Sequence, residues 1–134
     1  MQTFDLAEMA KLSGTKPATA KNWTVGRPFT IPASVHQAPG RGSINLYSID
    51  DVYLMAMANQ LSEAGMTARA IGDVVSEIPA GELAQAKILT IWKGAKGKVY
   101  VLPGDDRPPG VIVCHVVDVA RLVQGINQKL TGKK

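Results

Sequence analysis

Two neighbouring residues near the start of the chain, Lys21 and Asn22, have side chains that suit the surface of a nucleic-acid duplex. A lysine ammonium neutralises a phosphate or donates to the edge of guanine, and an asparagine amide pairs with adenine through two hydrogen bonds. Three small, polar or basic residues, Lys16, Ala18 and Thr19, stand in the same segment. These five residues are therefore the first candidates for contacts with a duplex.

The residues around this segment predict two short helices joined by a tight turn. Asp5 is suited to cap the first helix, and Gly14 supplies the left-handed conformation that ends it. Pro17 fits the first turn of the second helix, which runs to about Trp23 and leaves Ala20 and Trp23 to pack inward. The polar residues of the second helix then face outward, as a helix-turn-helix requires.

The segment that follows the second helix is rich in Gly and Pro, which interrupt helices and leave short extended pieces around residues 29–31 and 44–46. Two extended pieces joined by such a loop make a wing. Arg41 stands at a Gly-Arg-Gly tip and Arg27 lies near the start of the segment, so both are candidates for contacts with the minor groove. The alternative is that both are solvated loop charges.

Residues 4–75 resemble the DNA-binding domain of MerR-type transcriptional regulators. The family's turn and recognition helix are matched at Gly14, Pro17, Thr19 and Trp23, and its wing-to-helix junction is matched at Leu46, Tyr47, Ser48, Asp50 and Asp51. The resemblance implies a winged helix-turn-helix that binds DNA. The family usually has Arg followed by an aromatic residue inside the recognition helix, whereas this chain has Lys21 and Asn22, so individual base contacts do not transfer.

Two further helices are predicted after the wing. Ser48 has the features of an N-cap for a strongly apolar helix that ends at Gly65. Thr67 caps the next helix, and Arg69 lies near its start. Arg69 is a candidate phosphate contact, and simple exposure is an equal alternative.

The pattern changes to β-structure near residue 80. The β-rich runs are residues 88–92, 99–102 and 111–117. Asp118 then precedes an amphipathic helix. We therefore predict an α+β fold, with a MerR-like winged helix-turn-helix domain at residues 1–79 and a small antiparallel β-sheet with a C-terminal helix at residues 80–134.

This C-terminal β-β-β-α region is predicted to serve dimerisation or regulation, since about three strands bury little by themselves. MerR-type regulators usually dimerise through a long coiled coil, and no heptad stretch of that length is present here. Trp92 and Tyr100 are predicted as core or interface residues; a ligand-sensing role for them with Arg107 is the alternative.

Charge is distributed unevenly along the chain. Residues 1–47 hold five Lys or Arg against two Asp or Glu, residues 48–85 hold one against six, and residues 86–134 hold nine against three. The acidic middle belongs to the helices after the wing. The basic ends are therefore the parts expected to face DNA.

Several classes of function are disfavoured. A lone cysteine, Cys114, and two isolated histidines, His36 and His115, do not make a metal site, and we expect no metal or other cofactor. Neither a nucleophile–base pair nor a phosphate-binding Gly motif is recognisable, so an enzyme is not expected. The sequence shows no apolar run that could cross a bilayer, and we expect a cytoplasmic, nucleoid-associated protein without a membrane partner.

The sequence therefore predicts sequence-specific binding of double-stranded DNA by a bacterial or phage MerR-like transcriptional regulator, acting as a homodimer, with RNA polymerase or a phage protein as a further partner. One alternative is an architectural DNA-binding protein, similar to an excisionase or a small terminase subunit, that assembles with a recombinase or a packaging motor. Another is a protein-interaction module that does not bind DNA. Inverted repeats of fixed spacing favour the regulator, whereas bent DNA or tandem sites favour the architectural protein.

The wing hypothesis is tested at Arg41. Arg41→Ala should weaken binding to all DNA sequences, because one phosphate contact is lost. The slope of log affinity against log salt concentration should become shallower by about 1. Titrations of a fluorescent duplex at several salt concentrations measure the slope. An unchanged slope would show that Arg41 is a solvated loop residue.

Overall fold

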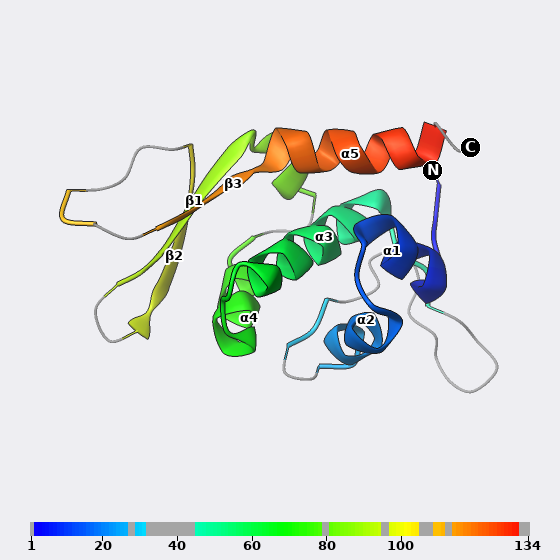
Figure 1. Ribbon diagram of the computed structural model, residues 1–134, viewed down its shortest axis with the longest axis horizontal. Helices are drawn as coiled ribbons and strands as arrows, with labels where there is room; N and C mark the ends of the chain where they lie inside the picture. Colours follow the sequence, from blue (N-terminus) through cyan, green and yellow to red (C-terminus); the bar gives the residue numbers. More distant parts are fainter. Residues whose placement is uncertain are drawn as a thin grey trace.

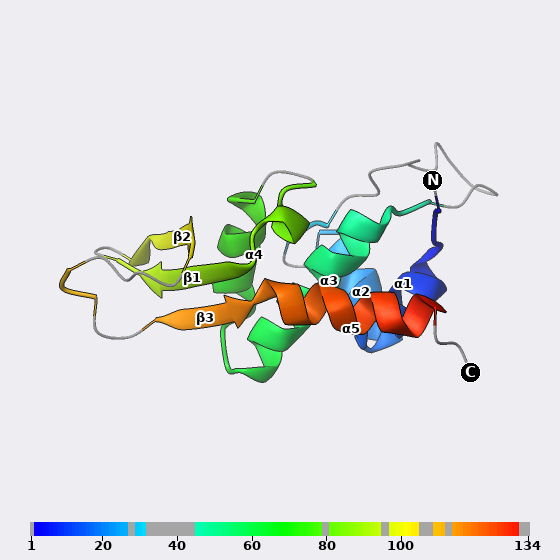
Figure 2. The ribbon, with the colours of Figure 1, turned by 90° about the horizontal axis from the view of Figure 1, so that it is seen from above.

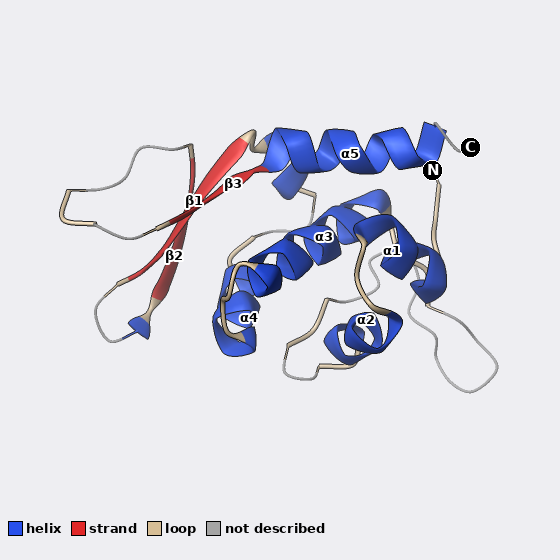
Figure 3. Ribbon diagram, viewed as in Figure 1, coloured by secondary structure: helices blue, strands red, loops and turns tan. Residues whose placement is uncertain are grey.

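The protein is α+β, with helices in the first part of the chain and an antiparallel sheet with a last helix in the second part (Figures 1 and 3). The structure, a computed structural model, describes residues 2–26, 29–31, 45–78, 81–94, 97–104, 109–111 and 114–131. The elements are α1 (Leu6–Ser13), α2 (Pro17–Thr24), α3 (Ile49–Glu63), α4 (Ala68–Ser76), the 3-10 helix η1 (Leu83–Gln85), β1 (Ile88–Lys93), β2 (Val99–Pro103), β3 (His115–Asp118) and α5 (Val119–Thr131).

The start of α1 and its connection to α2 follow the sequence-based prediction. The Asp5 carboxylate accepts the Glu8 N–H at 2.9 Å, and the Glu8 carboxylate accepts the Asp5 N–H at 2.9 Å, which together satisfy two amide donors at the helix start. Gly14 ends the helix with φ of 75°, a conformation that costs other L-residues free energy. Pro17 begins α2 as predicted.

Helix α3 lies at the centre of the helical part and contacts α1, α4 and α5 (Figure 1). A second capping box starts it: the Ser48 hydroxyl accepts the Asp51 N–H, and the Asp51 carboxylate accepts the Ser48 N–H at 2.9 Å. Apolar side chains are buried on several sides of the helix, including Val52, Met55, Met57, Ala58 and Leu61. An apolar surface on more than one side is what a helix needs when neighbours surround it.

The starts of α1 and α3 are joined by backbone pairing that the sequence analysis did not predict. Phe4 and Tyr47 form an isolated antiparallel bridge, with N–H···O distances of 2.9 Å from Phe4 and 2.8 Å from Tyr47. Both side chains are buried. Each residue immediately precedes the N-cap of its helix, so the bridge fixes the beginnings of the two helices relative to each other.

Of the predicted wing, the structure describes only the two ends. Ile31 donates its N–H to the Trp23 carbonyl at 2.7 Å, and Phe29 and Ile31 are buried. The next described residue after Ile31 is Asn45. Residues 32–44, including Arg41, lie outside the described residues, as does Arg27.

The sheet has the order β2-β1-β3, with both neighbours antiparallel to β1. This confirms the predicted small antiparallel sheet, although the third strand starts at His115 and not at residue 111. Leu89, Ile91 and Val99 are buried. Tyr100, predicted as core or interface, is 39% exposed and stacks on Trp92 with ring centroids 5.5 Å apart.

Helix α5 returns from the sheet and lies along α3 as far as α1 (Figure 2). Asp118, which directly precedes the helix as expected, caps it by accepting the Arg121 N–H at 3.0 Å. The Tyr53 hydroxyl donates to Asn127 Oδ1 at 2.8 Å, which links α3 to α5. Within the described ranges, no helix combines the length and the apolar character that crossing a bilayer needs.

The contact between α3 and α5 is tested at Tyr53, whose pKa is raised above its usual value, first because burial disfavours the phenolate. Tyr53→Phe should lower the free energy of unfolding by about 1 kcal/mol at neutral pH, since one hydrogen bond is lost. The tyrosine of the unfolded chain has a pKa of about 10, which is lower than that of Tyr53 in the folded protein. Above this pH the unfolded wild type loses the phenol proton and is thereby favoured, so the free energy of unfolding of the wild type falls. The difference in unfolding free energy between the wild type and Tyr53→Phe should therefore narrow. Urea unfolding on either side of that pH measures both effects.

Tyr100→Phe is the matched control, since it removes a phenol hydroxyl from an exposed ring. The control should be nearly as stable as the wild type. Equal stability of the two variants at every pH would contradict the assigned role of the Tyr53 hydroxyl.

Candidate nucleic-acid interface

Helix α2 has a buried face and an exposed face. Ala20 and Trp23 are buried at 0% and 5% exposure, as predicted. Ala18, Lys21 and Asn22 are exposed, and their spacing of three and four residues places them on one side of the helix. The structure thus separates the apolar anchors of α2 from the candidate contact residues.

The remaining candidates of this segment lie at the start of the same helix. Lys16 is the N-cap residue of α2 and is exposed, while Thr19 is half-buried. Five of the predicted site residues therefore lie on α2 or at its N-cap. Small and flexible side chains dominate this surface, so another molecule can approach the helix backbone closely.

Buried contacts hold α2 in place. The Trp23 and Phe29 ring centroids are 5.0 Å apart, and both residues are buried. In the turn before α2, the Ser13 hydroxyl donates to Thr15 Oγ1 at 2.8 Å, and the Thr15 N–H donates to the Ala10 carbonyl at 3.0 Å. The turn and the helix are thus fixed by packing and by hydrogen bonds, which is the condition for presenting side chains in a defined geometry.

A groove of about 660 Å³ borders the exposed face of α2. Ala18 and Lys21 line it together with the first two turns of α1, and Asn45 and Tyr47 line it from the segment before α3. Sequence reasoning missed Asn45, because only the pairing of Phe4 with Tyr47 brings this segment beside α1. Lys21 therefore lies beside a concave surface and beside the end of the predicted wing.

The charges around α1 and α2 favour an anionic partner. Lys11, Lys16 and Lys21 are all exposed. The two acidic residues of this part, Asp5 and Glu8, are engaged with each other's backbone in the capping box. Three lysines stand against two carboxylates among residues 2–26, so this part of the chain carries one excess positive charge.

Arg69 lies on a different element from the other described candidates. It is exposed in the first turn of α4, whose N-cap Thr67 accepts the Ala70 N–H at 3.2 Å. In Figure 1, α2 and α4 both lie on the side of α3 that is opposite to α5. The helix that carries Arg69 is thus on the same side of α3 as α2, although Arg69 is not part of the α2 cluster.

No protein-family model matches this chain, and no curated protein matches it at a significant level. The resemblance of residues 4–75 to MerR-type regulators therefore rests on the residues quoted for it.

The turn before α2 is tested at Gly14. Gly14→Ala should lower the free energy of unfolding by about 1–2 kcal/mol, because it forces a β-carbon into the left-handed region. A β-carbon at Gly14 meets no atom within 4 Å, so the expected cost is conformational and not steric. Gly14→Asn is the matched control, since asparagine tolerates this conformation better. Equal unfolding free energies for the wild type and both variants in urea would contradict this account of the turn.

Proposed function

We propose that the protein binds double-stranded DNA in a sequence-specific manner, through a winged helix-turn-helix similar to that of MerR-type regulators, as a bacterial or phage transcriptional regulator. The observation that carries the proposal is the exposed face of α2, where Lys21 and Asn22 lie on the same side as Ala18 while Ala20 and Trp23 are buried. The proposed site of action is the cytoplasm, in association with the nucleoid.

The dimensions of α2 suit the major groove. An α-helix with its side chains is about 10–12 Å across, and the major groove of B-DNA is about 12 Å wide. The small side chain of Ala18 allows close approach, so Asn22 reaches the edge of an adenine and Lys21 reaches a guanine or a phosphate. Base specificity is thus assigned to Asn22 first.

The other candidates are assigned to the DNA backbone. Lys16 and the Thr19 hydroxyl, near the start of α2, and Arg69, in the first turn of α4, are placed where helix dipoles also favour anions. Arg27 and Arg41, in the predicted wing, are proposed to contact the DNA at the minor groove. These contacts set affinity and orientation, whereas base contacts set specificity.

A homodimer is the proposed binding form. Two copies place their α2 helices on successive turns of the duplex and double the phosphate contacts. The sheet offers an apolar surface for self-association, since Tyr100, Leu102 and Val116 are 39%, 44% and 55% exposed. RNA polymerase or a phage protein is the proposed further partner of the DNA-bound dimer.

One observation favours the architectural alternative. The last described helix, α5, has 13 residues and packs against α3 and α1 of its own chain. The long coiled coil by which MerR-type regulators set their dimer geometry therefore has no counterpart in the described residues. An excisionase-like or small terminase-like protein needs no such dimer, because it assembles on DNA with a recombinase or a packaging motor.

Base recognition is tested at Asn22. Asn22→Ala should cost about 1–3 kcal/mol of binding free energy on the preferred site and relax the preference at one base pair, because the paired hydrogen bonds to adenine are lost. Fluorescence anisotropy with the preferred duplex and with a scrambled duplex measures both effects.

Gln128→Ala is the matched control, since it truncates an exposed amide on α5. The control should bind both duplexes like the wild type. Equal losses on the preferred and scrambled duplexes for Asn22→Ala would contradict base recognition by this residue.

A further inference from the structure

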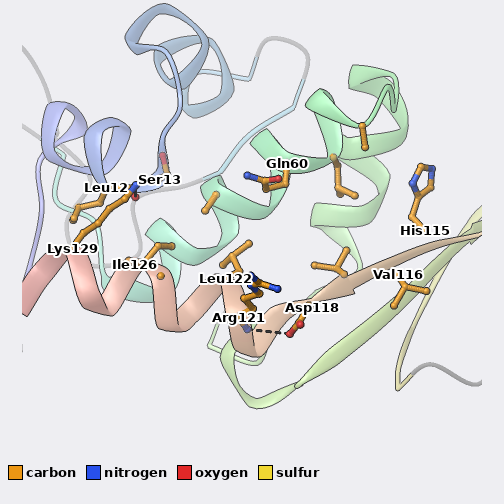
Figure 4. A pocket seen from close by; sticks show the side chains of 15 residues that line it. Leu12, Ser13, Gln60, His115, Val116, Asp118, Arg121, Leu122, Ile126 and Lys129 are labelled. Atoms are coloured by element: carbon orange, nitrogen blue, oxygen red, sulfur yellow. Dashed lines mark hydrogen bonds between the residues drawn. The ribbon is translucent and has the colours of Figure 1, made fainter.

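A second concave surface lies on the other side of the molecule from α2, between α5 and α3 (Figure 4). It has a volume of about 550 Å³ and is bordered by the end of α1, the second half of α3, β3 and one side of α5. We call it the α5 groove. Its volume falls within the range of small-molecule sites, which is about 300–1,000 Å³.

The lining of the α5 groove is apolar at its floor. Leu61 and Ile126 are buried at 3% and 4% exposure, and Ala56, which also lines the groove, is buried as well. Leu122 is half-buried on the same side of α5. This floor suits the hydrocarbon or aromatic body of a ligand.

The rim of the groove carries more positive than negative charge. Arg121 and Lys129 line it from α5, eight residues apart, which is about 12 Å along the helix. Asp118 is the one carboxylate among the described lining residues, and it accepts the Arg121 N–H at 3.0 Å as the cap of α5. The Lys129 ammonium donates to the Leu12 carbonyl at 3.2 Å. The Arg121 guanidinium, with its planar set of donors, is therefore the better partner for an added anion.

Gly125 leaves open space on the side of α5 that lines the groove. It lies inside α5, where glycine is less favourable than alanine by about 1 kcal/mol. A β-carbon at this position would meet no atom within 4 Å, so no close neighbour requires glycine here. Gly125 lies four residues from both Arg121 and Lys129, so a longer side chain at this position would enter the groove between the two cations.

We propose that the α5 groove binds a small amphipathic organic anion. Its apolar body lies on Leu61, Leu122 and Ile126, its carboxylate or similar group pairs with the Arg121 guanidinium, and the space beside Gly125 admits the body between the two helices. The site is independent of the proposed DNA surface, because the lining residues do not include any residue of α2 or α4.

The proposal is tested on the full-length chain with anilinonaphthalene sulfonate, a fluorescent aromatic anion, in the absence of DNA. We expect saturable binding of one probe per chain, with displacement by decanoate and not by decylammonium, which has the same chain length and the opposite charge. Gly125→Leu should weaken probe binding at least tenfold by filling the groove. Gln124→Leu is the matched control, because it adds the same side chain at an exposed position one residue away and should bind like the wild type.

Arg121→Gln provides a second variant that leaves the groove open and keeps the side chain polar. It should weaken binding of the anion severalfold. The proposal is overturned if folded Gly125→Leu binds the probe as the wild type does, if Arg121→Gln has no effect, or if decylammonium displaces the probe as well as decanoate does. Since no DNA is present, a failure here is distinguishable from a failure of the proposed DNA binding.

Discussion

The backbone pairing of Phe4 with Tyr47 is the constraint on which the helical part of the structure depends. It joins two residues that immediately precede N-caps, so the beginnings of α1 and α3 are held side by side while each helix satisfies its own first amides through a capping box. Helix α2 follows α1 after a turn that begins at Gly14, so the position of α2 depends on the position of α1. Every candidate contact on α2 depends on this chain of local and non-local bonds.

Helix α3 connects the two surfaces to which we assign roles. Helices α2 and α4, with the proposed DNA contacts, lie on one side of it, and α5 with its groove lies on the other side (Figure 1). The end of α1 belongs to both regions, since Leu12 and Ser13 line the α5 groove and Ser13 also bonds to the turn that leads into α2.

The sequence predicted the features that local chemistry determines. The caps at Asp5, Ser48 and Thr67, the left-handed Gly14 and the β-rich runs all depend on residues close together in the chain. The pairing of Phe4 with Tyr47, the Tyr53–Asn127 hydrogen bond and the α5 groove join residues far apart in the chain, and no periodicity encodes such contacts. The exposed face of α2 was predictable because it depends on residues close together in the chain. The groove beside it was not, because Asn45 and Tyr47 are far from α2 in the sequence.

The most direct test of the central claim is a selection of bound duplexes from a random DNA library, with purified full-length protein at physiological salt and a Lys21→Ala/Asn22→Ala double variant in parallel. The account predicts that the wild type enriches a defined sequence and that the double variant does not. An inverted repeat of constant spacing would identify the bound form as a symmetric dimer. Recovery of the unselected library by the wild type, or the same enrichment with both proteins, would contradict sequence-specific recognition by α2.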